Sequence, residues 1–277
     1  MFDILYLRII ILLIACGVAA YTDHKTGYIY DWISIPLIII GLIINIFSMS
    51  LYPLLTTIGI TVAIYLIGLI FYNLGKLGGG DIKLFMGINL ILPYFNGELF
   101  FLWVLIFASM LSVLIVSIIY LFKLIKQKKI TSKIFQRKLL IFKSLSLFLL
   151  YFFFLYFAIE IRGMSKWIYL SLLPMFFGSL IIIVEKEIKQ YIYLRKKAIT
   201  KLEEGDVLAK EFMSFTFIKK YKLEKINVLE NKDIKRIKEL SKKTSIRVVP
   251  IYDNLPRFGP YILLGALFVL IFFGFVF

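Results

Sequence analysis

Two aspartates stand at the edges of apolar runs, where a carboxylate is costly. Asp23 follows the first apolar run, and Asp81 opens a later one directly after three glycines. A charge at the centre of a bilayer costs about 2.5–3.5 kcal/mol, and membrane carboxylates therefore usually mark function. Two close carboxylates share one proton, so one acts as general base on a water and the other donates a proton to the attacked carbonyl. The pair predicts aspartic-protease chemistry, with no metal and no cofactor.

Each aspartate also has a purely structural interpretation. Asp81 suits the start of a helix after a flexible turn, where a carboxylate accepts backbone N–H bonds. Asp23 would be an interfacial carboxylate near Lys25. The combination favours function, because the chain crosses outward and back between the two residues. That hairpin returns the segment 75–81 to the membrane face of Asp23.

The elements that must position this pair are membrane helices. Of the 277 residues, 61% are hydrophobic, which is more than a soluble domain needs. Several apolar runs approach the roughly 20 residues that cross a bilayer as a helix. We expect an all-α polytopic membrane protein with six to eight transmembrane helices and a small cytoplasmic α+β domain. The apolar segments are 4–21, 29–47, 52–74, 82–95, 98–122, 144–161, 167–184 and 258–277.

The net charge of +16 indicates topology rather than nucleic-acid binding, since no recognition motif accompanies it. The basic residues collect in 123–143 and 185–257, which is typical of cytoplasmic segments and of attraction to anionic lipid. We therefore expect a multi-pass plasma-membrane protein with its termini outside and both aspartates at the cytoplasmic face. The predicted outside turn at 160–166 carries two basic residues against this trend.

The same patterns divide the chain. The predicted parts are a membrane catalytic core at 1–122, a basic cytoplasmic loop at 123–143, a transmembrane helix pair at 144–184, a cytoplasmic α+β domain at 185–256 and a C-terminal transmembrane helix at 257–277. Within the α+β domain, the stretches KINVLE and SIRVVPIY are typical of strands, and NKDIKRIKELSKK is typical of a helix. Pro250 lacks an N–H, which places the second strand at a sheet edge.

The residues around both aspartates resemble a known family. Gly78-Gly79-Gly80-Asp81 fits the GxGD motif of membrane aspartyl proteases, and GGGDIKL resembles its prepilin peptidase form. The stretch from Asp23 through Lys25 to Asp31 is similar to the first site of that family. The ending LPRFGPYILLGALF is similar to its final helix. The resemblance covers three separate segments.

The resemblance implies that Asp23 and Asp81 are the catalytic pair and cleave at the cytoplasmic face. Implied substrates are type IV prepilins or archaeal preflagellins of the archaellum, whose short basic leader precedes a hydrophobic helix. The best-known bacterial members carry paired CxxC motifs and N-methylate the new terminus. This chain has one cysteine, Cys16, and a short first loop, so methylation is not expected. Its shorter plan resembles the archaeal peptidases, and it leaves the oligomeric state open.

Two other functions fit some of the residues. The presenilin branch also uses GxGD, but pairs it with YD and PAL sequences; here Thr22 precedes Asp23 and no PAL occurs. A proton-coupled transporter also uses paired membrane carboxylates, and inverted repeats would favour it. The sequence contains no such repeat. Cleavage of a precursor in detergent distinguishes the protease from a transporter.

Polar neighbours of the aspartates have supporting roles at most. His24, the single histidine, is interpreted as an interfacial polar residue. Lys25 and Lys83 each follow an aspartate by two residues, and either tune its ionisation or extend to the interface. Asp31 is a helix N-terminal charge or a site for a basic leader residue. Gly78, Gly79 and Gly80 are predicted to let an extended substrate backbone approach Asp81.

Overall fold

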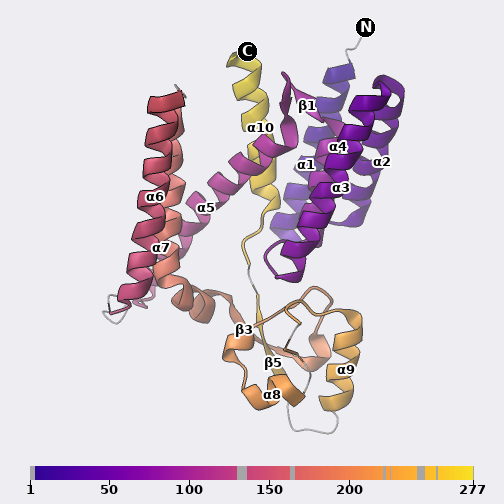
Figure 1. Cartoon of the computed structure of the whole chain (residues 1–277). Coiled ribbons are helices and arrows are strands. Elements are labelled where there is room, and N and C mark those ends of the chain that lie inside the picture. The colour runs from indigo at the N-terminus through magenta and orange to yellow at the C-terminus, as the bar shows by residue number, and fades with distance from the viewer. Residues whose placement is uncertain are drawn as a thin grey trace. The chain divides into compact units, whose positions relative to one another are not determined.

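A computed structural model describes residues 4–129, 136–162, 166–220, 223–224, 226–241, 247–253 and 255–276. All eight predicted apolar segments contain a helix (Figure 1). Parts of the predicted turn at 160–166 and of the predicted strand at 245–252 lie outside the described residues. The helices are α1 (Ile4–Thr26), α2 (Asp31–Ser48), α3 (Leu51–Asn73), α4 (Gly79–Ile91), α5 (Phe100–Lys126), α6 (Lys138–Arg162), α7 (Leu172–Ile188) and α10 (Gly259–Val276).

Among the residues that the structure describes, six spans are long and apolar enough to cross a bilayer. They are α1, α2, α3, α5, most of α6 and the segment Tyr169–Tyr193 that contains α7. By contrast, α4 has 13 residues, fewer than the roughly 20 that a full crossing needs. The chain is therefore a multi-pass membrane protein in which one short apolar helix lies among longer ones.

The helices and a small α+β region form two compact units. The first unit comprises residues 1–108, 196–251 and 257–277, and the second comprises 109–195 and 252–256. In the first unit, α4 packs between α2 and α3, and α10 packs along α1. Phe100, Leu12 and Ile262 are fully buried members of this core. The short helix that carries Asp81 is thus enclosed by protein.

Glycines allow α2 and α4 to approach closely. A Cβ atom on Gly41 of α2 would lie 2.7 Å from the carbonyl carbon of Leu90. A Cβ atom on Gly87 of α4 would lie 2.6 Å from a methyl carbon of Leu37. Only a residue without a side chain fits at either place. Close backbone packing of this kind is typical of helix pairs in membranes, where small residues form the interface.

The α+β region contains a three-stranded sheet and two short helices. The strands are β3 (Leu194–Ala198), β4 (Val207–Leu208) and β5 (Val248–Tyr252), and the helices are α8 (Phe215–Lys220) and α9 (Asn231–Ser241). Figure 1 labels most of these elements. The buried core includes Leu208, Leu229, Ile237 and Val249. A two-stranded hairpin of β1 (Tyr94–Phe95) and β2 (Glu98–Leu99) precedes α5.

The expected edge position of Pro250 is wrong. The strand order is β3-β5-β4, so β5 is central. Proline is tolerated there because β4 is only two residues long, and Pro250 takes part through its carbonyl oxygen, which accepts a hydrogen bond from the Ala209 N–H at 3.1 Å. The predicted strand KINVLE is reduced to one isolated bridge, between Val228 and Val207.

The second unit is built on the pair α6 and α7, which pack against each other. Arg137 donates two hydrogen bonds to the Glu187 carboxylate, at 3.0 and 2.6 Å. The buried Ser144 hydroxyl donates to the Ser179 carbonyl at 2.7 Å. The first contact connects α7 to Arg137, the residue just before α6, and the second connects α6 to α7 further along both helices.

Candidate active site

Asp23 lies in the last turn of α1, where its carboxylate meets the beginning of α10. The residue is 6% exposed. Its Oδ2 accepts a hydrogen bond from the Gly259 N–H at 2.7 Å, and Gly259 is the first residue of α10. The positive end of a helix dipole therefore faces this carboxylate. A Cβ atom on Gly259 would lie 2.9 Å from the Asp23 Cβ atom, so a side chain at this position would displace the aspartate.

Asp81 is the third residue of α4 and caps the helix that carries it. Its Oδ2 accepts a hydrogen bond from the Gly78 N–H at 3.1 Å. Asp81 therefore has the structural role that the sequence also indicated, because its carboxylate accepts a hydrogen bond from an N–H group at the start of the helix that has no partner within the helix. Phe85, four residues after Asp81 on α4, lies with its ring centroid 6.1 Å from that of Phe258, which directly precedes the Gly259 that binds Asp23. The structure therefore brings together the two aspartates that the sequence singles out.

The glycines before Asp81 have different surroundings. Gly78 is exposed, and Gly79 faces the ring of Tyr72 with room for a Cβ atom at 3.8 Å. A Cβ atom on Gly80 would lie 2.6 Å from the carbonyl oxygen of Ile29. Gly80 therefore allows α4 to pack against the segment between α1 and α2. That packing holds Asp81 near the end of α1.

The predicted supporting residues divide into two groups. Lys83 and Asp31 form an ion pair at 2.5 Å, which links α4 to the start of α2. Both side chains are partly exposed, so the pair contributes less than about 1 kcal/mol. Lys25 is exposed and lies over the ring of Tyr21, and His24 is exposed beside Asp23.

A buried arginine holds the far end of α4. Arg8 of α1 is 6% exposed and donates to the carbonyl oxygen of Ile91 at 2.7 Å. It also donates to Asn45 Oδ1 at 2.8 Å and to Ser48 Oγ at 2.7 Å, both on α2. The Asn45 side chain donates in turn to the Leu90 carbonyl at 2.8 Å. Hydrogen bonds from a charged donor are stronger than neutral ones, so this cluster fixes the C-terminal end of α4.

A second buried contact fixes α4 to α3. Asn89 Nδ2 donates to the Thr57 carbonyl at 3.1 Å and to Thr61 Oγ1 at 2.9 Å. All three residues are buried. Interhelical hydrogen bonds of this kind contribute modestly in a membrane but select one register of the helices. The helix that carries Asp81 is therefore held from both neighbours.

Sequence reasoning missed the part that α10 plays at the site. Besides the Gly259 N–H, the charge of Arg257 acts on Asp23. Both residues belong to the stretch LPRFGPY, which was interpreted only as part of a final helix. The signal was present as a glycine and an arginine at the start of an apolar run. Their target was not predictable, because Asp23 lies 236 residues earlier.

Metal ligands do not gather at the site. In the part of the chain that the structure describes, no three His, Cys, Asp or Glu side chains are placed to hold a metal ion. Cys16 is buried inside the first core cluster. The chemistry available to the described residues at this site is therefore that of two carboxylates, backbone N–H groups and the charge of Arg257.

Comparisons with known proteins agree with this geometry. Residues 10–125 match the model of the type IV leader peptidase family, and this segment contains both Asp23 and Asp81. The chain is 32% identical over 92 residues to the prepilin peptidase EppA of Methanothermobacter thermautotrophicus. The match covers 32% of this chain and about a quarter, 24%, of the relative. No solved structure matches. The expected resemblance is confirmed as a similarity: residues 10–125 resemble the type IV leader peptidase family.

Proposed function

We propose that the chain is a membrane aspartic endopeptidase that removes the short basic leader from prepilin-like or preflagellin precursors. The observation that carries this proposal is that the end of α1 and the start of α4 lie beside one contact: Gly259 binds Asp23, and the neighbouring Phe258 lies with its ring centroid 6.1 Å from that of Phe85, four residues after Asp81. Both lie in the segment that matches the peptidase family. The described residues offer acid–base groups but no clustered metal ligands there.

The proposed mechanism uses the two carboxylates as one unit. The ionised member takes a proton from water, and the resulting hydroxide adds to the carbonyl carbon of the scissile bond. The protonated member gives its proton to the carbonyl oxygen, which yields a neutral tetrahedral intermediate. When the C–N bond breaks, the leaving nitrogen receives a proton from one carboxyl group, and the other carboxylate takes a proton from a hydroxyl of the intermediate, so that the pair again holds one proton. Because the two groups are coupled, the proton belongs to the pair rather than to one residue.

Backbone donors support different parts of this mechanism. The Gly259 N–H fixes the rotamer of Asp23, and the Gly78 N–H fixes that of Asp81. Fixed carboxylates need little rearrangement to reach the reactive geometry. The exposed Gly78 leaves space on the side of Asp81 where an extended substrate backbone would approach. Gly80, in contrast, acts through its packing on Ile29.

The substrate class and the membrane face complete the proposal. The relative that matches is named as a prepilin peptidase, which supports a prepilin-like precursor over other membrane helices. The basic segments at 123–143 and 185–257 favour a cytoplasmic position by the positive-inside rule. The active site is then cytoplasmic, and a leader rich in basic residues reaches it from that side. The proposed reaction ends with cleavage, without N-methylation.

Mass spectrometry of the cleaved products tests the proposal. Purified protein in detergent is incubated with a prepilin precursor and a preflagellin precursor, each carrying its leader. We expect one new N-terminus at the junction of basic leader and apolar helix. The control is a precursor whose residues at that junction are replaced by proline. Absence of cleavage of every precursor, or cleavage at scattered sites, would contradict the proposal.

A further inference from the structure

The loop at 74–78 leads from α3 into the helix that carries Asp81, and it touches the α+β region. Gly75 in this loop has φ of +66°, a backbone conformation that favours glycine. A Cβ atom on Gly75 would lie 3.2 Å from Val207 Cγ1 and 3.7 Å from Val228 Cγ2. All these residues belong to the first compact unit. The loop before Asp81 therefore passes close to two valines that lie far away in sequence, and a side chain at Gly75 would press against Val207.

A hydrogen bond joins the same two segments. Asn227 Nδ2 donates to the carbonyl oxygen of Asn73 at 3.1 Å. Asn73 is the last residue of α3, where helical carbonyl groups lack an intrahelical partner. The Asn227 side chain thus caps the C-terminal end of α3. One side chain of the α+β region therefore fixes the point from which the loop departs.

The segments that make this contact are themselves well held. We call residues 205–208 and 227–229 the docking tip. Three backbone hydrogen bonds pair its halves: Leu208 N–H to the Asn227 carbonyl at 2.8 Å, Leu229 N–H to the Asp206 carbonyl at 2.9 Å, and Gly205 N–H to the Leu229 carbonyl at 2.9 Å. Val207 and Val228 form the bridge between the halves. The tip is therefore a short paired ribbon rather than a loose loop.

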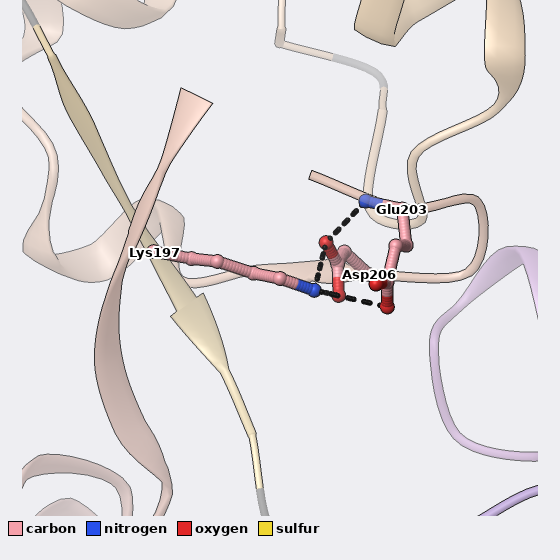
Figure 2. Close-up of polar contacts among 3 residues, drawn as sticks. All are labelled: Lys197, Glu203 and Asp206. Atoms are coloured by element: carbon pink, nitrogen blue, oxygen red, sulfur yellow. Dashed lines mark hydrogen bonds and ion pairs between the residues drawn. The ribbon is translucent and has the colours of Figure 1, made fainter. Parts of the chain in front are cut away.

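An ion network fixes the turn that leads into the docking tip, as Figure 2 shows. Lys197 Nζ lies 3.0 Å from both oxygens of Asp206 and 3.2 Å from Glu203 Oε2. Asp206 Oδ2 also accepts the Glu203 N–H at 2.9 Å. The Asp206 side chain is only 10% exposed, so water screens this interaction less than at an open surface. Lys197 therefore ties the tip to β3.

Tyr72 connects the contact to the first turn of α4. Its ring faces Gly79, at 3.8 Å from the position of a Cβ atom there. The charges of Glu204 and Glu230, on either side of the docking tip, act on Tyr72, and so does Lys83 of α4. Tyr72 thus lies beside Gly79, two residues before Asp81, while Asn227 of the α+β region binds Asn73, the residue that follows Tyr72.

We infer that the α+β region is a positioning element for Asp81, acting through the docking tip. It lies outside the segment 10–125 that matches the peptidase family, so it is an addition to the matched core. The inference rests on the proposed function, because it concerns the geometry of the Asp81 carboxylate during cleavage. A shift of about 1 Å in a catalytic group lowers the rate by up to about 100-fold. Holding the loop therefore protects the rate more than the affinity for precursor.

Kinetics of two docking variants test this inference. We expect Asn227→Ala and Gly75→Ala each to lower kcat about 10- to 100-fold, with KM changed less than about twofold. Asn227→Ala should leave the unfolding temperature unchanged, whereas Gly75→Ala should lower it about as much as Gly97→Ala, because both glycines have a positive φ. Asn231→Ala is the control for Asn227, since the Asn231 side chain bonds to Glu204 within the α+β region. Gly97→Ala is the control for Gly75, since Gly97 has φ of +83° and nothing within 4 Å of its Cβ position. An unchanged kcat in both docking variants would overturn the inference.

Crosslinking tests the contact without any cleavage. Cysteines replace Asn73 and Asn227 in a Cys16→Ser background, and a short thiol crosslinker is added to the resting protein. We expect rapid crosslinking, with a kcat that is lowered by the loss of Asn227 and raised again by the crosslink, and slow crosslinking in a control pair of Asn73→Cys with Glu239→Cys. No crosslink above this control would overturn the inference. If the unmodified protein cleaves no precursor, the proposed function fails, while crosslinking still reports the docking.

Discussion

Two apolar helices of this protein, α4 and α6, have opposite surroundings. The 13-residue α4 buries most of its length, with Ile82, Leu84, Phe85, Ile88, Leu90 and Ile91 among its buried residues. The 25-residue α6 exposes large apolar side chains along most of its length, namely Leu139, Phe142, Leu145, Leu150, Phe153, Phe154 and Phe157. Similar residue types therefore serve an internal helix in one region and a lipid-facing helix in the other.

The difference shows how a membrane protein fixes a catalytic group. A helix exposed to lipid, such as α6, can tilt and rotate with few specific contacts, because the bilayer solvates its side chains. The position of α4 is instead set by backbone packing on Gly41 and Ile29, and by hydrogen bonds from Arg8 and Asn45. Functional side chains need such support to keep a productive geometry. Of the two helices compared, α4 has this support, and α4 carries Asp81.

The largest effect on activity and stability is expected from Gly80→Val, which disturbs the packing of α4. A Cβ atom at Gly80 would lie 2.6 Å from the Ile29 carbonyl oxygen, and backbone cannot easily yield. We expect at least a 100-fold loss of precursor cleavage together with a loss of about 1–3 kcal/mol in unfolding free energy. Initial rates and thermal unfolding in detergent measure the two effects.

Gly79→Ala is the matched control for Gly80. Its Cβ position lies 3.8 Å from the Tyr72 ring, an ordinary van der Waals distance. We expect this variant to keep the unfolding temperature and to lose little activity. If Gly80→Val loses activity at full stability, the glycine serves substrate approach, as the sequence first indicated. If Gly80→Val retains both activity and stability, α4 does not pack as closely on Ile29 as the structure shows.

A smaller effect, on stability, is expected from Gly41→Ala. Gly59→Ala is its matched control. Both glycines lie inside transmembrane helices, but a Cβ atom on Gly41 would lie 2.7–2.8 Å from backbone atoms of Leu90 and Ile91, whereas one on Gly59 would have nothing within 4 Å. We expect Gly41→Ala to lower the unfolding free energy by about 1–3 kcal/mol through overpacking. Gly59→Ala should be neutral or slightly stabilising, because alanine favours the helix. Equal unfolding temperatures of both variants would contradict the claim that close packing on Gly41 fixes α4.

The sequence predicts the members of the site better than their supports. Asp23 and Asp81 were identifiable because carboxylates beside apolar runs are rare and the hairpin between them is short. The Gly259 N–H and the charge of Arg257 were not, because nothing local links the start of α10 to a residue on α1. Arg8 stood out only as a charge before an apolar run. Its burial depends on acceptors from α2 and α4, which only the folded chain brings together.

The sheet shows the same limit on a smaller scale. Pro250 predicted an edge strand, since proline removes a ladder donor. The structure makes β5 central because the neighbouring β4 is short and uses the Pro250 carbonyl. Eight apolar segments predicted eight helices correctly, because periodicity and length act locally. Partner choice between segments is a long-range property, and composition does not determine it.

The smallest effect on stability is expected in α6, the helix of the comparison that faces lipid, from Ser144→Ala. The Ser144 hydroxyl donates to the Ser179 carbonyl at 2.7 Å and is buried. Interhelical hydrogen bonds in membranes average about 0.6 kcal/mol, so we expect a loss of that order in unfolding free energy. Cleavage activity should be unchanged, because neither of the proposed catalytic residues, Asp23 and Asp81, lies on α6. A tenfold loss of activity would show that α6 and α7 contribute to the site.

The central claim is that Asp23 and Asp81 work as one unit, and a double-variant comparison tests it most directly. Precursor cleavage is measured for Asp23→Asn, Asp81→Asn and the variant that combines both, with thermal unfolding as the check of folding. Because either loss destroys the shared proton, we predict that each single variant falls at least about 100-fold, to the same residual rate as the double variant. Folded single variants that keep substantial turnover, or losses that multiply in the double variant, would contradict the paired mechanism.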